Sequence, residues 1–162
     1  MGDASHIAWE ARPGVVVRHA WPWDAWDLAP FLRQADRLEI HLSCGKTPLQ
    51  VLVDGIEQSE QAYTLLAEDR VRAIFGVARQ TDTFGVVWLL GSDWLQAHPR
   101  VVLEGATKFL PILAEGYRSV GNLIHNKQTI YIRFLEKLGF EFREHPEFPK
   151  EFLLFVGDFS HV

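Results

Sequence analysis

The pattern of apolar and polar positions is clearest in residues 121–140. A short apolar strand is followed by Asn126, a residue type suited to cap a helix. Apolar side chains then recur at the helical period, at Ile130, Phe134, Leu135 and Leu138. Gly139 stands where a left-handed helix terminator is expected, and Phe140 starts a new extended run. The pattern predicts a strand, a helix and a second strand.

The first half of the chain begins with a strand and continues with helices. A β-branched run at residues 15–19 predicts the first strand, and residues 1–14 before it are expected to form a loose arm. Asp24 is suited to cap a helix, and Pro30 either begins a second helical piece or kinks a longer one. Thr47, followed by Pro and then by Gln three positions after the cap, predicts the next helix start.

The period then changes to that of strands. Three strands joined by tight turns are predicted at 62–67, 71–79 and 85–90. His98 and Pro99 open the longest predicted helix, with Pro111 inside it. Two last strands are predicted at 140–144 and 152–156. The order is therefore β-α-α-β-β-β-α-β-α-β-β, an α/β fold with a mostly antiparallel, mixed sheet.

Length and composition restrict the class of protein. A chain of 162 residues predicts one domain with a sizeable core, covering residues 1–162. The longest apolar run, 86–90, is too short to span a bilayer, so no membrane partner is expected. The first residues lack a secretory pattern, and the single cysteine, Cys44, cannot form an internal disulfide. We therefore expect the protein in the cytoplasm where it is made.

Charge and side-chain spacing restrict the partners. The net charge is −5 and no run of Lys or Arg occurs, so nucleic acid is not expected as a partner. No two of the seven histidines have the spacing of paired metal ligands, so no metal site is predicted. Trp21, Trp23 and Trp26 suggest an aromatic patch beside the first helix. We expect two of them to be buried, while an exposed one could belong to a protein interface.

The sequence FLEKLGF at residues 134–140 resembles the C-terminal signature of the GNAT superfamily, the N-acetyltransferases that use acetyl-CoA. The chain also resembles the GNAT-like proteins of short-tailed bacteriophages, including their internal virion protein A. That second resemblance rests on Asn122, Asn126 and the segments 132–135, 138–140, 35–39, 45–48, 75–77 and 88–93. It implies a GNAT-like sheet, splayed between the fourth and fifth predicted strands with helices on both faces. It also implies a phage origin, with the protein in the host cytoplasm or packaged in the virion.

The resemblance further implies a site for acetyl-CoA. In GNAT enzymes the splay admits the pantetheine arm, and backbone amides after the fourth strand bind the pyrophosphate. The corresponding residues here are Leu90, Gly91 and Ser92, with Asn126 near the cofactor. This turn lacks the Arg/Gln-x-x-Gly-x-Gly/Ala pattern of the family, and Asp93 adds a negative charge. A turn without cofactor, and a purely structural cap at Asn126, are the alternatives.

Candidates for acid and base chemistry follow from the same resemblance. The tyrosine that often protonates the leaving thiolate aligns with Leu135, which cannot donate a proton. Tyr131, one helical turn earlier, is the substitute candidate. Glu39, His41 and His125 are candidates for the general base, although a solvated Glu and a hydrogen-bonded His are the ordinary structural roles of such residues.

Two functions therefore remain open. The first is a phage GNAT-like enzyme that binds acetyl-CoA and acetylates an amine of a host or phage protein, with a degenerate active site. The second is a GNAT-fold binding module without catalysis, either a virion-associated protein or a host-takeover protein that binds a host factor. Fold alone does not decide between them.

Overall fold

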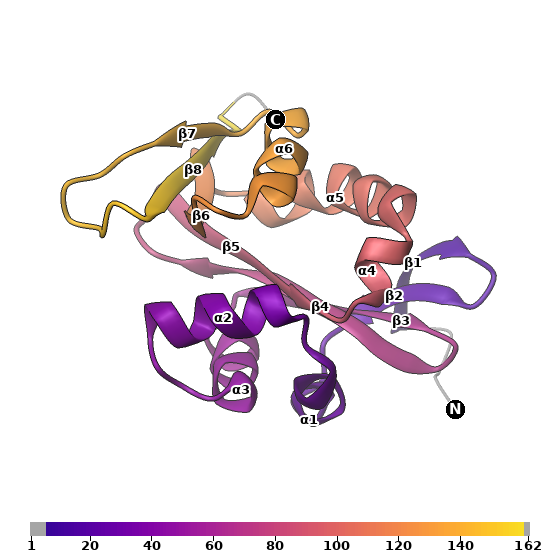
Figure 1. Ribbon diagram of the computed structural model, residues 1–162. Helices are drawn as coiled ribbons and strands as arrows, with labels where there is room; N and C mark the ends of the chain where they lie inside the picture. Colours follow the sequence, from indigo (N-terminus) through magenta and orange to yellow (C-terminus); the bar gives the residue numbers. More distant parts are fainter. Residues whose placement is uncertain (1–5, 161–162) are drawn as a thin grey trace.

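The computed structural model describes residues 6–160, and Figure 1 shows one continuous sheet with helices on both of its faces. The sheet has eight strands in the order β1-β2-β3-β4-β5-β6-β8-β7. All neighbours are antiparallel except β5 and β6, which run parallel. The predicted α/β class and mixed sheet are confirmed.

The elements have these bounds. The strands are β1 Ile7–Arg12, β2 Val15–His19, β3 Gln61–Ala67, β4 Arg70–Arg79, β5 Phe84–Gly91, β6 Ser119–His125, β7 Glu141–Arg143 and β8 Phe152–Asp158. The helices are α1 Asp24–Leu28, the 3-10 helix η2 Ala29–Phe31, α2 Gln34–Ser43, α3 Pro48–Gln58, α4 Trp94–Ala97, α5 Pro99–Ala114 and α6 Thr129–Lys137.

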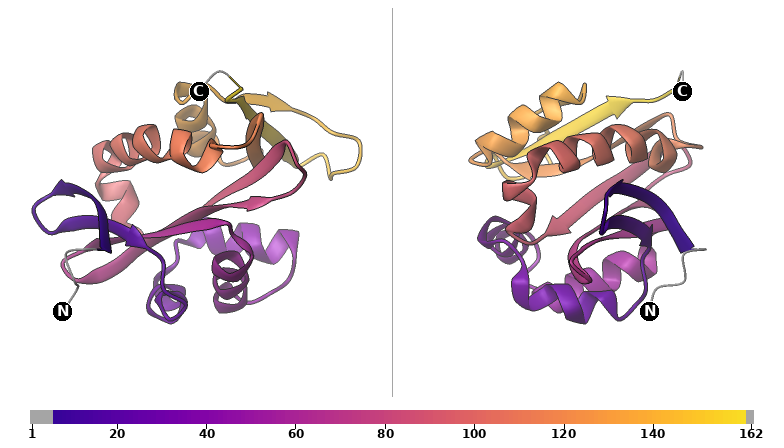
Figure 2. Two further views of the ribbon diagram at one scale, coloured as in Figure 1. Left: turned by 180° about the vertical axis from the view of Figure 1, so that it is seen from behind. Right: turned by 90° about the vertical axis from the view of Figure 1, so that its right-hand side faces the viewer.

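Helices cover both faces of the sheet (Figure 2), and an apolar core lies on each face. One lies between the sheet and helices α5 and α6 and contains Val77 and Phe109. The other lies under α1, α2 and α3 and contains Leu28, Leu52 and Ile74. Because successive side chains of a strand point to opposite faces, β4 contributes to both cores.

Residues 7–12 of the predicted N-terminal arm are ordered, while residues 1–5 lie outside the described residues. Ile7–Arg12, expected as part of a loose arm, form the edge strand β1, which pairs antiparallel with β2. The indole of Trp9 packs edge-on against Phe109 of α5, with ring centroids 6.1 Å apart. This contact anchors β1 to the main core. The alternation of Trp9 and Ala11, which are partly buried, with exposed Glu10 and Arg12 is the period-2 signal of this strand.

Helix α6 differs from its prediction at its start. The helix begins at Thr129, and Asn126 does not cap it; instead the Asn126 N–H donates to the Glu151 carbonyl at 2.7 Å. Ile130 is 78% exposed, although the pattern placed it inward. The later start rotates the apolar face, which contains Tyr131, Ile132, Leu135 and Leu138. Gly139 has φ 94°, so the predicted left-handed terminator is confirmed.

The first helical region also departs from expectation. Trp23 and Trp26 are 58% and 56% exposed, so the prediction that two of the three tryptophans are buried is wrong. Asp24 does not cap α1. Its carboxylate is buried and accepts hydrogen bonds from both terminal nitrogens of the Arg18 guanidinium, at 2.8 and 3.0 Å, and from the Thr64 hydroxyl at 2.7 Å. In this region the Asp24 carboxylate is therefore buried, while the indoles of Trp23 and Trp26 face outward.

Strands β5 and β6 separate after a short paired stretch. They pair at only three positions: Phe84 with Ser119, Gly85 with Val120 and Val86 with Gly121. Beyond them β5 continues to Gly91 without a β6 partner, while β6 pairs with β8 as far as His125. The splay predicted between the fourth and fifth strands is confirmed at this place. No helix within residues 6–160 is long and apolar enough to cross a membrane.

Candidate functional site in the gap between β5 and β6

The unpaired edge of β5 presents backbone groups to the gap. Gly91 uses its N–H and its carbonyl away from β4, toward Asp36 and Arg33 of the α2 region. Alternate residues of an antiparallel strand point their backbone groups to the same edge. The N–H and carbonyl of Leu89 and Val87 therefore also face the gap. An extended chain that carries amides could pair with this edge.

Asn122 lies where the pairing of β5 and β6 ends. Its side-chain amide donates to the Val87 carbonyl at 2.8 Å, and its side-chain oxygen accepts the N–H of Leu123 at 2.7 Å. The side chain thus replaces the next backbone bond between the strands. This makes Asn122 the residue at which the gap starts.

Helix α2 crosses the opposite, open end of the gap. Asp36 accepts the Gly91 N–H at 3.0 Å from the β5 side, and Glu39 accepts the His125 N–H at 2.7 Å from the β6 side. The two carboxylates are three residues apart and so lie on one face of the helix. One helix therefore binds the ends of both strands that the splay has separated.

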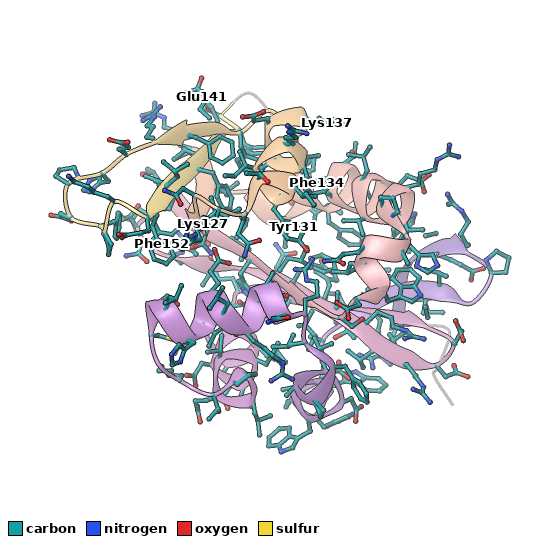
Figure 3. All side chains as sticks on the ribbon, in the orientation of Figure 1. Lys127, Tyr131, Phe134, Lys137, Glu141 and Phe152 are labelled. Carbon is teal, nitrogen blue, oxygen red and sulfur yellow. The ribbon has the colours of Figure 1, made fainter. Side chains whose placement is uncertain are left out.

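Arg33 connects this helix to α6. Its guanidinium donates to both oxygens of Asp36, at 2.9 and 3.0 Å, and to the Tyr131 hydroxyl at 2.8 Å. It also lies 4.7 Å from the centre of the Tyr131 ring. Figure 3 shows the Tyr131 side chain pointing from α6 toward the sheet and α2. Arg33 is 5% exposed, so this link is shielded from water.

Tyr131 is held with its proton available. Its oxygen accepts N–H groups from Arg33 and, at 3.2 Å, from Gln96 of α4. A phenolic oxygen can accept two hydrogen bonds and donate one. Because both contacts are donors to the oxygen, the hydroxyl proton remains for a third group in the gap.

Burial shifts the two carboxyl groups of α2. Burial raises the pKa of Asp36, while Arg33 and the Gly91 N–H act in the opposite direction. Burial likewise raises the pKa of Glu39, against the His125 N–H, and the nearby Asp36 carboxylate raises it further. A carboxylate with a raised pKa is a better proton acceptor than an exposed one. Glu39 thus has the electrostatic setting of a general base.

The turn proposed for the cofactor phosphates has its amides in use. Leu90 pairs with Ile74 in the sheet, Gly91 donates to Asp36, and the Ser92 N–H donates to the Arg72 carbonyl at 2.8 Å. The short helix α4 follows directly, and its Trp94 N–H donates to the Ser92 hydroxyl at 3.3 Å. These three N–H groups are therefore not free for phosphate.

The structure brings together most of the predicted site residues. Glu39, His125, Tyr131 and Gly91 meet around α2, whereas the exposed side chain of Asn126 lies outside this network. The residues missed from the sequence are Arg33, Asp36, Gln96 and Asn122. Asp36 and Glu39 do carry a signal, because two carboxylates one turn apart mark a single helix face. Within residues 6–160 no group of three metal-ligating side chains is found.

Comparison with known proteins places the fold. No protein-family model matches the chain, and no curated protein matches it. Among solved structures it is similar to an acetyltransferase from Streptococcus agalactiae, with TM-score 0.71, 14% identity and coverage of 91% of this chain and 99% of that one. It is also similar to the GNAT domain of S. lividans PAT, with TM-score 0.70, 14% identity and coverage of 98% and 99%. A third is the PaiA N-acetyltransferase from Thermoplasma acidophilum in complex with coenzyme A, with TM-score 0.62, 10% identity and coverage of 90% and 99%. The chain thus has the fold of GNAT acetyltransferases.

Proposed function

We propose that the chain binds acetyl-CoA in the gap between β5 and β6 and transfers the acetyl group to an amine. The observation that carries the proposal is the splay itself, with Glu39 and Tyr131 reaching it from opposite faces of the sheet. The backbone of Leu89 would hold the amide-bearing arm as an added strand would. The similar structures support the proposal, since one of them was solved with coenzyme A.

The residues of the gap have separate chemical tasks. Bound acetyl-CoA would supply the acetyl group as a thioester. Glu39 takes a proton from the attacking amine, which makes its nitrogen a nucleophile. Tyr131 gives its hydroxyl proton to the leaving sulfur, and the side-chain N–H of Gln96 on α4 stabilises the phenolate that remains. The amide bond forms and the thioester bond breaks, with one proton taken up and one supplied by the protein.

Calorimetric titration with acetyl-CoA and with CoA tests binding. We expect micromolar affinity, followed by amine-dependent release of CoA, detected by chromatography because exposed Cys44 would react with thiol reagents. Glu39→Gln should bind acetyl-CoA and lose amine-dependent turnover, while Glu57→Gln, an exposed residue of α3, should behave as the wild type. Absence of binding at millimolar acetyl-CoA would rule out the proposal.

A binding module for a protein partner is the second candidate. It is favoured by the outward aromatic side chains Trp23, Trp26 and Phe31, which are 58%, 56% and 62% exposed. Large exposed aromatics are typical of binding hot spots. The partner would be a host or virion protein, in keeping with the phage resemblance of the sequence.

This second candidate predicts that replacing all three aromatics with Ser abolishes capture of one defined host or virion protein and leaves acetyl-CoA titrations unchanged. Replacing Leu103, which is 40% exposed on α5, is the matched surface control. Equal capture by the wild type and the triple variant would exclude this surface.

A further inference from the structure

The carboxylates of α2 occupy the backbone donors that a ligand in the gap would use. Asp36 takes the N–H of Gly91, and Glu39 takes the N–H of His125 on the other side of the gap. Arg33 adds its own backbone N–H to the Gly91 carbonyl at 2.9 Å and binds the Tyr131 hydroxyl. The end of the gap is therefore filled by the chain's own polar groups.

The attachment of α2 is mainly polar. Ile40 is its one fully buried apolar side chain, while Leu38 and Leu42 are 53% and 52% exposed. A helix with a small buried apolar face depends on its specific bonds to stay in place. Most of those bonds end on β5, β6 or α6, the elements that border the gap.

We infer that α2 is an internal competitor for the gap, and that it must lift when the arm of acetyl-CoA enters. We call the contacts of Arg33, Asp36 and Glu39 with Gly91, His125 and Tyr131 the α2 latch. An arm that pairs with Leu89 and continues along the edge of β5 next meets the Gly91 N–H, which Asp36 holds. The bond from Arg33 to the Tyr131 hydroxyl joins α2 to α6 at the same end of the gap. The inference rests on the proposed function and adds the regulation of that site.

A latch lowers the apparent affinity for the ligand. The measured dissociation constant equals the intrinsic one divided by the fraction of molecules whose gap is open. Each latch contact that is removed raises this fraction. A side chain that only helps to bind the ligand would have the opposite effect when it is removed. The sign of the change therefore separates the two roles.

Titration of latch variants with acetyl-CoA provides the test. Glu39→Ala and Tyr131→Phe should each bind acetyl-CoA about tenfold more tightly than the wild type, as loss of one charge-assisted bond predicts. Two controls are matched in chemistry and lie away from the gap: Glu57→Ala, exposed on α3, and Tyr63→Phe, whose hydroxyl donates to Gln61. They should stay within about twofold of the wild type. Unchanged or weaker binding by both latch variants would overturn the latch.

Amide hydrogen exchange without ligand separates failure of the latch from failure of the proposed function. In Glu39→Ala, the Gly91 amide should exchange at least about tenfold faster, although its own acceptor, Asp36, is intact. This coupling is expected only if α2 lifts as a unit. If no variant binds acetyl-CoA, the proposed function fails and the exchange result alone decides the latch. If the Gly91 amide exchanges in Glu39→Ala at the same rate as in the wild type, the latch is overturned.

Discussion

Two buried arginine–aspartate pairs, each with two hydrogen bonds, serve different parts of this molecule. Arg18 and Asp24 form one, with side chains 10% and 1% exposed, and Arg33 and Asp36 form the other, at 5% and 8%. In the first pair, the remaining bonds of Asp24 go to Thr64 and to the Trp21 N–H, so the network stays among β2, α1 and β3. In the second, Asp36 accepts the Gly91 N–H of β5, and Arg33 donates to the Tyr131 hydroxyl of α6. The same two residue types thus stabilise one packed layer and bridge a gap in another.

The largest effect is expected for the closed pair. Asp24→Ala leaves the Arg18 guanidinium buried without a counter-charge and should lower the free energy of unfolding by about 3–5 kcal/mol. Urea unfolding measures this change. Asp27→Ala, at an exposed position of the same helix, should stay within about 0.5 kcal/mol of the wild type. Equal small losses in the two variants would contradict the role given to Asp24.

A smaller loss is expected for the pair at the gap. In Asp36→Ala, Arg33 keeps its bond to the Tyr131 hydroxyl, so we expect the free energy of unfolding to fall by about 2–3 kcal/mol. The Gly91 amide should also exchange faster under native conditions. If Asp24→Ala speeds hydrogen exchange at Gly91 more than Asp36→Ala does, the two pairs do not have the separate roles described here.

A third, smaller effect on stability tests whether the gap starts at Asn122. Asn122→Ala removes the donor to the Val87 carbonyl and should cost about 1–2 kcal/mol in urea unfolding. Asn126→Ala is the matched control, because its side chain is exposed, and it should stay within about 0.5 kcal/mol. If Asn126→Ala costs as much as Asn122→Ala, the start of the gap is wrongly placed.

The smallest effect concerns pH. Burial raises the pKa of Glu39 above its ordinary value of 4.5. Its contribution to stability is therefore fully present below pH 4.5 and is lost as the pH rises through the raised pKa. Relative to Glu39→Gln, the wild type should lose stability across that interval. Melting temperatures of both proteins from pH 4 to pH 8 check the sign. A wild type that gains stability over the same interval would contradict the burial of Glu39.

Local signals in the sequence predicted much of the fold. The β-branched run at 15–19, the Thr-Pro start of α3 and Gly139 each act through their own backbone or the next turn, so spacing along the chain reveals them. Where local signals compete, prediction failed. Asn126 is a good capping residue by type, but its backbone extends the pairing of β6 to the Glu151 carbonyl, and α6 starts later.

The site was less predictable because its bonds join distant parts of the chain. Asp36 binds Gly91 across 55 positions, and Arg33 binds Tyr131 across 98. Each of these residues looks like an ordinary surface residue until the strands between them are placed. Glu39 and Tyr131 were found through the resemblance to GNAT proteins, whereas Arg33, the partner of Tyr131, carries no signal of its own.

The most direct test of the gap as a ligand site is a titration of the isotopically labelled protein with acetyl-CoA, followed by the amide signals in nuclear magnetic resonance spectra. We expect the signals of Leu89, Gly91 and His125 to shift together, while the signal of Thr64, which is hydrogen-bonded to Asp24 away from the gap, stays in place. Shifts confined to other parts of the chain, or no shifts at millimolar acetyl-CoA, would contradict the gap as the ligand site.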